Sequence, residues 1–213
     1  MASERARGGG ADAALDRALT HPFIGRLARR LSARAPSVIE LDRRARRAAV
    51  ALILRVGGSE QVELLLIKRA TWEGDPWSGQ IALPGGRHEG GETLVQTAVR
   101  EAREETAIDL ARDGVILGPL DDVQPHSVVL PRLVITPFVG AVGGVGEVTQ
   151  SEEVAEAFWM PVNALRAPGA AREVILELAG GPRRMPSFQY RGYTIWGLTE
   201  RILEQFLALT TDE

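Results

Sequence analysis

The chain of 213 residues contains no cysteine, carries a net charge of only -3 and has no long apolar run. The absence of cysteine excludes disulfides, thiolate zinc sites and cysteine nucleophiles, and it is compatible with a reducing cytosol. The small net charge gives no general attraction to nucleic acid. No run approaches the roughly 20 apolar residues that span a bilayer. We therefore expect a cytoplasmic protein that has neither nucleic acid nor membrane as a partner.

Sequence signals of several other enzyme classes are also missing. The chain has no GxGxxG motif and no Walker loop. Ser78, Ser127 and Ser151 lack the sequence context of a nucleophile, which disfavours a serine hydrolase. Neither His88 nor His126 has metal-ligand spacing, although His88 is placed where it could touch a phosphate bound by the nearby glycines.

Three glutamates stand on one turn of a predicted helix, a short distance after a Pro-Gly-Gly loop. An ideal helix advances about 100° per residue, so Glu101, Glu104 and Glu105 fall within an arc of about 100°. Like charges at this spacing disfavour a helix by roughly a few tenths of a kcal/mol per pair, unless a positive charge lies among them. Oxygen-rich clusters of this kind suit Mg²⁺ or Mn²⁺. The spacing therefore predicts a divalent-metal site.

The opposite face of this helix has the i, i+3, i+4, i+7 spacing of a stripe that packs on a core. The stripe comprises Val95, Ala98, Val99 and Ala102. On the same helical wheel Glu105 borders the stripe, Glu101 lies farther round and Glu104 points most outward. A partly buried carboxylate needs a positive partner, either a metal or an arginine. Arg100 can meet Glu104 along the helix or reach back to Glu92.

The segment 86–108 closely resembles the Nudix box of the Nudix hydrolases. The match consists of Gly86, then Glu92 after five residues, and after seven more the run REAREETAI at 100–108. One departure is Ala107, where the family usually has glycine. That position lies near the helix C-terminus, where glycine relieves a left-handed backbone. We expect the departure to affect the local turn more than the chemistry.

A solvated, salt-bridged surface helix is the alternative interpretation of this segment. It does not explain Pro84-Gly85-Gly86 immediately upstream. Two adjacent glycines let a backbone approach a ligand closely and expose its amides or carbonyls to that ligand. We therefore favour the metal site.

The resemblance implies a metal-dependent pyrophosphohydrolase that uses Mg²⁺ or Mn²⁺ and acts on a small-molecule nucleotide. Its implied metal ligands are Glu101, Glu105 and the carbonyl of Gly85, and Glu104 either binds a second cation or takes the proton from the attacking water. Glu101 and Glu104 are thus the catalytic candidates. Glu153, with Glu152 beside it on a predicted loop before a strand, is a distal carboxylate that can swing toward the metals.

Substrate contacts are expected from Arg69 and Gly86. Arg69 ends a predicted strand and either holds a phosphate or pairs with a neighbouring carboxylate. Trp72 and Trp77 in the following loop either stack on an adenine ring or, more commonly, pack the loop onto the domain. Three further aromatic residues fall in apolar runs typical of a core, namely Phe158, Trp159 and Trp196.

The predicted elements follow one another in a mixed order. Residues 48–56 and 62–69 are strand-like runs joined by Gly57-Gly58-Ser59-Glu60, which predicts a hairpin. Further strands are predicted at 80–83, 115–120, 128–142, 155–160, 174–178 and 193–196, with a last helix at 198–209. This order favours an α+β fold over a doubly wound sheet. We expect a Nudix-type α/β/α sandwich with a mixed β-sheet and an N-terminal helical extension.

We divide the chain into a flexible tail at 1–10, the helical extension at 11–46 and the Nudix hydrolase domain at 47–213. The extension has four leucines and Phe23 spaced near four within 11–35, which predicts an amphipathic helix that Pro22 interrupts. The arginines between 26 and 47 form a basic stretch that either contacts phosphate groups or lies on a solvated face docked on the domain or on a second subunit. The sequence leaves a homodimer open.

Within the superfamily the chain most resembles the coenzyme A pyrophosphatase branch. The supporting segments are LLIKRA at 65–70, GQIALPGG at 79–86, TPFV at 136–139 and IWGLT at 195–199. Three departures stand beside them: Asp75 occupies a position where the branch has arginine, the loop 71–78 is one residue longer, and Leu83 replaces phenylalanine. The resemblance implies hydrolysis of the pyrophosphate bond in a nucleoside diphosphate linked to another moiety, with coenzyme A or acyl-coenzyme A first.

Two alternatives to this function remain. One is a Nudix hydrolase of another substrate, such as an oxidised nucleoside triphosphate, a nucleotide sugar or a dinucleotide polyphosphate. The other is a module that binds nucleotides without hydrolysing them. The intact glutamates 101, 104 and 105 argue against the module, because a sensor does not need three clustered carboxylates.

Overall fold

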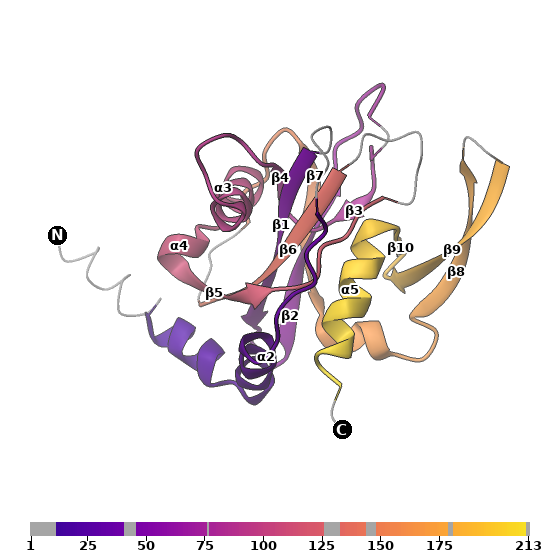
Figure 1. Ribbon diagram of the computed structural model, residues 1–213. Coiled ribbons are helices and arrows are strands. Elements are labelled where there is room, and N and C mark those ends of the chain that lie inside the picture. Colours follow the sequence, from indigo (N-terminus) through magenta and orange to yellow (C-terminus); the bar gives the residue numbers. More distant parts are fainter. Residues whose placement is uncertain are drawn as a thin grey trace.

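The computed structural model describes residues 12–40, 46–75, 77–125, 133–143, 148–178 and 181–211. A mixed β-sheet forms its centre, with helices against both faces, and a three-stranded antiparallel sheet stands beside it (Figure 1). The main sheet comprises β1 (Arg46–Val56), β2 (Val62–Arg69), β3 (Ile81–Ala82), β4 (Gly85–Arg87), β5 (Gly114–Pro119), β6 (Leu133–Val142) and β7 (Val154–Pro161). The second sheet comprises β8 (Ala171–Leu178), β9 (Gly181–Tyr190) and β10 (Tyr193–Trp196). This architecture confirms the predicted α+β sandwich.

Strand β1 is the centre of the main sheet. It pairs antiparallel with β2 and β4 and parallel with β6, while β3 and β7 pair with β2, and β5 pairs with β6. The β1–β2 hairpin was predicted and is confirmed. Because β4 follows β3 and returns to β1, the glycine segment lies inside the sheet, next to the central strand.

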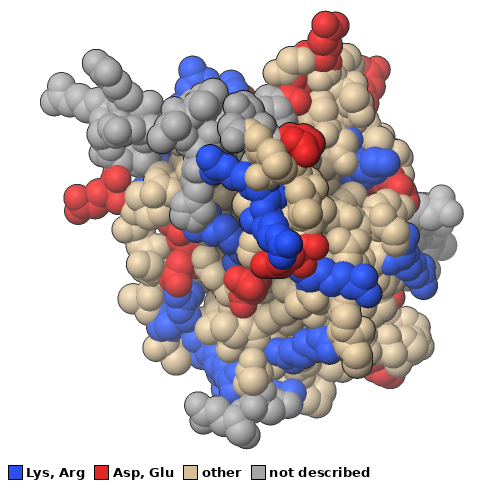
Figure 2. Space-filling model, turned by 90° about the vertical axis from the view of Figure 1, so that its right-hand side faces the viewer, with Lys and Arg blue, Asp and Glu red and all other residues tan. Residues whose placement is uncertain are grey.

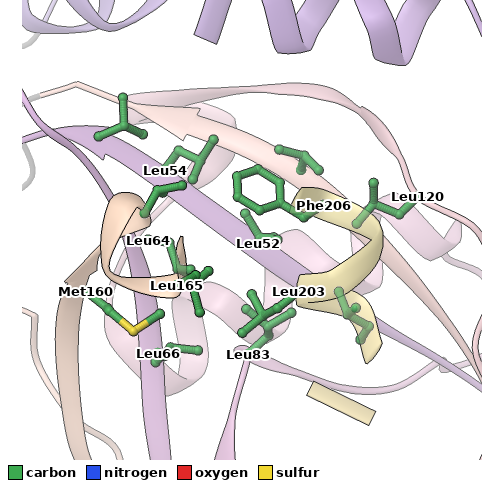
Figure 3. Close-up of a cluster of buried hydrophobic side chains, with 14 of the residues drawn as sticks. Leu52, Leu54, Leu64, Leu66, Leu83, Leu120, Met160, Leu165, Leu203 and Phe206 are labelled. Carbon is green, nitrogen blue, oxygen red and sulfur yellow. The ribbon is translucent and has the colours of Figure 1, made fainter. Parts of the chain in front are cut away.

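The alternation of side chains along β1 builds two apolar cores. Leu52 and Leu54 point to one face, where they pack with β2, β7 and α5 (Leu198–Ala208) (Figure 3). Ala51 and Ile53 point to the other face, where they pack with α3 (Leu94–Thr106) and α4 (Leu110–Asp113). The small side chains on the second face let α3 lie close to the sheet.

The N-terminal extension packs on the first core. Residues 12–20 are helical, His21 breaks the helix, and α2 (Pro22–Ser32) begins with Pro22 in its first turn, as predicted. Leu27 and Leu31 are buried in the first core. Arg30 donates hydrogen bonds to the carbonyls of Leu209 and Thr211 after α5. The helix therefore docks on the domain, whereas the predicted tail at 1–10 lies outside the described residues.

Several described arginines of the basic stretch have protein partners. Arg34 pairs with Asp121, and Arg47 lies 3.4 Å from a carboxylate oxygen of Asp122. Figure 2 shows Lys and Arg side chains interspersed with Asp and Glu on the side that carries β8 and β9.

Within the described parts of the chain, no helix combines the length and the hydropathy needed to cross a lipid bilayer.

Strand β9 was not predicted. Its residues include Pro182 and Pro186, which normally argue against a strand inside a sheet. They fit here because β10 pairs only with residues 187–190 of β9, so the edge facing β10 is open at both prolines. The short α4 and the 3-10 turn Val162–Arg166 were also not predicted.

Glu200 makes part of the fold sensitive to pH. It is only 3% exposed on α5, and burial together with the carboxylate of Glu204 raises its pKa to about 7. A carboxyl whose folded-state pKa lies above its unfolded value of 4.5 contributes stability below pH 4.5 that is lost as the pH rises through 7. Glutamine does not titrate. We therefore expect Glu200→Gln to raise the free energy of unfolding at about pH 8, by about 2 kcal/mol.

Urea unfolding of wild type and variant at about pH 4.5 and about pH 8 tests this. The gain should vanish at the lower pH. An equal difference at both pH values would show that the carboxyl group does not titrate between them.

Candidate active site

Helix α3 supplies the candidate carboxylates. A capping box starts it, in which the Thr93 side chain accepts from the Gln96 N–H and the Gln96 side chain accepts from the Thr93 N–H. Ala98 and Ala102 are fully buried against the sheet, as the predicted stripe requires. The helix is thereby fixed in both its start and its rotation.

The rotation places the glutamates in the predicted order of burial. Glu105 is 3% exposed, and the side chains of Glu101 and Glu104 are 17% and 57% exposed. Val95 and Val99, both assigned to the buried stripe, are only partly buried, and Thr97 is buried.

The two glycines of β4 touch these carboxylates. The Gly85 N–H donates to Glu105 Oε2 at 2.8 Å. A Cβ at Gly85 would lie 2.4 Å from the Ala49 carbonyl oxygen, and a Cβ at Gly86 would lie 2.3 Å from Glu101 Oε1. A Cβ at Gly85 would clash with the backbone of β1, and a Cβ at Gly86 would displace the Glu101 carboxylate, so the two glycines let β4 lie close to both β1 and α3.

Hydrogen-bond alternation also turns the Gly85 carbonyl away from β1. The Ala51 N–H donates to the Pro84 carbonyl, and the His88 N–H donates to the Arg47 carbonyl. In an antiparallel pair such bonds recur at every second residue, so both polar groups of Gly85 face away from β1. Its carbonyl therefore lies on the side where its N–H meets Glu105.

Arg100 is the main counter-charge of the cluster. Its Nη1 donates to Glu101 at 2.9 Å and to Glu104 at 3.0 Å. Its Nε and Nη2 donate to Glu92 at 3.2 and 3.0 Å, and Nη2 also donates to the Arg87 carbonyl. Both contacts predicted for Arg100, with Glu92 and with Glu104, therefore form at the same time.

The buried carboxylates are only partly compensated. Burial raises the pKa of Glu105 to about 7, and the hydrogen bond from Gly85 offsets part of the rise. Burial also raises the pKa of Glu101, against the effect of Arg100, and the charge of Glu153 adds to both shifts. A group of carboxylates that still lacks positive charge has the chemistry of a site for a hard divalent cation.

The three glutamate side chains of α3 do not point to one common centre. Among the described residues, no three Asp, Glu or His side chains lie together at the spacing that holds a metal ion. Arg100 draws Glu101 and Glu104 toward itself, while Glu105 is bound to Gly85. Binding a cation here requires these side chains to turn away from their present partners.

The loop before β7 lies against the same end of α3. The Ala70 N–H donates to the Glu153 carbonyl at 2.8 Å, and the Ser151 N–H donates to the Glu105 carbonyl at 3.3 Å. Glu152 and Glu153 are both exposed. The structure thus brings Glu153 into the electrostatic range of Glu101 and Glu105, although its sequence position is distant.

Arg69 pairs with the carboxylate of Asp75, which was one of the two alternatives predicted for it. Its Nη2 lies 3.4 Å from Asp75 Oδ2, and its charge lowers the pKa of Glu105. Its Nε is buried without a hydrogen-bond partner in the described structure. Arg69 therefore lies near the carboxylates, but its role in holding phosphate stays a prediction.

The aromatic residues only partly follow the sequence analysis. Trp72 is 56% exposed, so the expectation that it packs the loop onto the domain is wrong, while Trp77 is half-buried. Phe158 and Trp159 are half-buried at the edges of the two cores, and Trp196 is half-buried. His126 lies outside the described residues.

Thr97 is a site residue that the sequence analysis missed. Its hydroxyl contacts Glu92, and its side chain is fully buried. The available signal was its position four residues before Glu101, on the same side of the helix. A threonine at such a position resembles an ordinary helix residue until its partner in the preceding loop is known.

Ala107 adopts the left-handed conformation suspected from the sequence, with φ 60° and ψ 12° at the C-cap of α3. A Cβ is unfavourable there, so we expect Ala107→Gly to raise the free energy of unfolding by about 1 kcal/mol, measured with urea. Ala208→Gly, at the exposed right-handed end of α5, is the matched control and should lower it by about 0.5 kcal/mol. Equal changes in the two variants would contradict the backbone argument.

A mixed sheet whose glycine strand pairs with the central strand and contacts a helix of clustered glutamates has the arrangement expected of an enzyme that processes phosphate compounds with divalent cations. The NUDIX domain family model matches residues 45–178. The chain belongs to the Nudix family, and it is a pyrophosphohydrolase. Enzymes of this family generally use divalent metal ions and act on small-molecule nucleotides.

Two relatives and one solved structure are examples of the proteins to which the chain is similar. The uncharacterized Nudix hydrolase NudL of Pectobacterium atrosepticum is 32% identical over 152 residues, covering 70% of this chain and 76% of that protein. The protein of the same name from Cronobacter sakazakii is 34% identical over 154 residues, with the same two coverages. A MutT/nudix family protein from Enterococcus faecalis shares the fold with a TM-score of 0.54 and 16% identity, over 80% of this chain and 64% of that one.

Proposed function

We propose that the protein hydrolyses the pyrophosphate bond of coenzyme A or acyl-coenzyme A with Mg²⁺ or Mn²⁺. Convergence of three of the four branch-like segments, 65–70, 79–86 and 195–199, around β3 carries this proposal. Ile67 in the first segment pairs with Ala82 in the second, and Thr199 in the last segment donates to the Ile81 carbonyl at 3.0 Å. The second segment then continues into Gly85, which donates to Glu105.

Glu101 and Glu105, with the carbonyl of Gly85, are the proposed ligands of the first cation. A bound cation neutralises charge on the diphosphate and lowers the pKa of an attacking water. Glu104 is the most exposed of the three glutamates, and we assign it either a second cation or the proton of that water. Glu153 is the distal ligand or base, and Arg69 and Gly86 contact the substrate.

One observation favours another nucleotide as substrate. Asp75 stands where the coenzyme A branch has arginine, and it pairs with Arg69. The pair replaces two positive charges by a net charge of zero at the end of β2, which weakens attraction to a phosphate-rich substrate. Among the alternative substrates this observation favours a nucleotide sugar as the second candidate, because it carries only a diphosphate, over a dinucleotide polyphosphate or an oxidised nucleoside triphosphate.

A substrate panel with Mg²⁺ and with Mn²⁺ distinguishes the two candidates. The panel contains coenzyme A, acetyl-coenzyme A, ADP-ribose, diadenosine polyphosphates and deoxynucleoside triphosphates, and chelation of the metal is the blank. Coenzyme A should give adenosine 3',5'-bisphosphate and phosphopantetheine. If coenzyme A is untouched while another compound is hydrolysed well, the choice of substrate is wrong and the reaction class stands.

We also propose the division into an extension at 11–46 and a catalytic domain at 47–213, together with a cytoplasmic location. The family match supports the division because it begins at residue 45.

A further inference from the structure

A buried hydroxyl group stands behind the candidate metal carboxylates. Thr97 lies on α3 with 0% exposure, and its Oγ1 is 2.7 Å from Glu92 Oε1, 3.1 Å from His88 Nδ1 and 3.3 Å from the Thr93 carbonyl oxygen. A hydroxyl has one proton to donate. The closest acceptor is the Glu92 carboxylate, so the Thr97 hydroxyl donates its hydrogen bond to Glu92. The hydroxyl oxygen then accepts a hydrogen bond from His88 Nδ1.

The hydrogen bonds then continue in one direction to the site. The Glu92 carboxylate accepts a hydrogen bond from the Thr97 hydroxyl and further hydrogen bonds from Nε and Nη2 of Arg100. These bonds occupy two of the three nitrogens of the guanidinium. Its remaining nitrogen, Nη1, is the one that meets Glu101 and Glu104. Because Glu92 binds two nitrogens of Arg100, only Nη1 is left to donate hydrogen bonds to Glu101 and Glu104.

We propose that Thr97 is a positioning residue of the metal site, acting through Glu92 and Arg100, with His88 as its support. The inference rests on the proposed function, with Glu101 as a ligand of the first cation and Glu104 as the ligand of a second. A cation must take these carboxylates from Arg100. Thr97 keeps Glu92 in place, so that Arg100 retains an anionic partner when the two glutamates turn toward the cation. Without the hydroxyl, Arg100 competes with the cation for Glu101 and Glu104.

The test measures Mn²⁺ binding to the full chain in the absence of substrate, by the electron paramagnetic resonance signal of free Mn²⁺. Thr97→Val removes the hydroxyl at nearly constant volume and should raise the Kd at least about fivefold. Thr97→Ser restores the hydroxyl and should stay within about twofold of wild type. Circular dichroism and thermal unfolding of each variant show whether the fold is kept.

Thr106→Val is the matched control. Thr106 is also fully buried on α3, but its hydroxyl donates to the Ala102 carbonyl of the same helix. This variant should bind Mn²⁺ as wild type does, because it loses a buried hydroxyl outside the chain of bonds. A rise in Kd equal to that of Thr97→Val would assign the effect to helix stability and overturn the proposal.

A double-mutant cycle identifies the route. If Thr97 acts through Glu92, Thr97→Val should weaken Mn²⁺ binding no further once Glu92→Gln is present. Additive effects of the two changes, a wild-type Kd for Thr97→Val, or a Thr97→Ser variant as weak as Thr97→Val would each overturn the inference. If wild type itself binds no Mn²⁺, both the metal site of the proposed function and the positioning role of Thr97 are wrong. If wild type and Thr97→Val bind Mn²⁺ equally, only the positioning role is wrong.

Discussion

Replacing Glu105 with glutamine is expected to lower turnover at least about a hundredfold while the fold is kept. Glu105 is 3% exposed and accepts the Gly85 N–H, and a glutamine side-chain carbonyl can accept the same bond. The substitution therefore preserves shape and hydrogen bonding but removes one negative charge from the proposed cation site. Glu101→Gln should have an effect of the same order, because Glu101 is the second proposed ligand.

The measurement is kcat and kcat/KM on the best substrate of the panel over a range of Mg²⁺ concentrations, with urea unfolding as the check of the fold. Glu177→Gln, on the exposed outer strand β8, is the matched control and should behave as wild type. A Glu105→Gln variant with near wild-type turnover and unchanged metal dependence would rule out Glu105 as a ligand.

The two adjacent glycines should respond to alanine in opposite ways. A Cβ at Gly86 would meet the end of a flexible side chain, the Glu101 carboxylate, which can move aside. We expect Gly86→Ala to change the free energy of unfolding by less than about 1 kcal/mol but to lower turnover roughly a hundredfold, because a displaced ligand misplaces the cation.

Gly85→Ala is the matched comparison for this prediction. Its Cβ would meet the Ala49 carbonyl oxygen and Val50 Cα, which are backbone atoms of the central strand and cannot give way. We expect it to destabilise the protein by about 3 kcal/mol. Urea unfolding and turnover of both variants decide the matter. If Gly86→Ala is the less stable of the two and its folded fraction keeps wild-type turnover, the assignment of Glu101 fails.

Local spacing was enough to predict a large part of this protein. The order of burial of Glu105, Glu101 and Glu104 follows from the apolar stripe on one face of α3, because a helix fixes the angle between residues. The hairpin at Gly57-Gly58-Ser59-Glu60 and the break at Pro22 follow from backbone preferences of one or two residues. The pairing of Arg100 with Glu92 and Glu104 also followed from helix geometry and side-chain reach.

Other features could not be predicted because they depend on partners far away in the chain. Strand β9 contains two prolines, and it is acceptable as a strand only because β10 leaves its edge open at those positions. The exposure of Trp72 depends on how the loop after β2 lies on the domain. The fixed rotation of α3 turned Thr97 inward, where Glu92 and His88 in the preceding loop meet its hydroxyl.

The sequence by itself determined the chemistry: clustered carboxylates after two glycines, at a spacing that a helix converts into one anionic face suited to a divalent cation. The tertiary structure decided how that face is controlled. Packing of α3 on β1 brings Gly85 to Glu105, and the loop before β7 brings Glu153 to the same place. These contacts join residues 20 to about 50 positions apart, and only the packed sheet fixes distances over that range, since local backbone preferences act within a few residues.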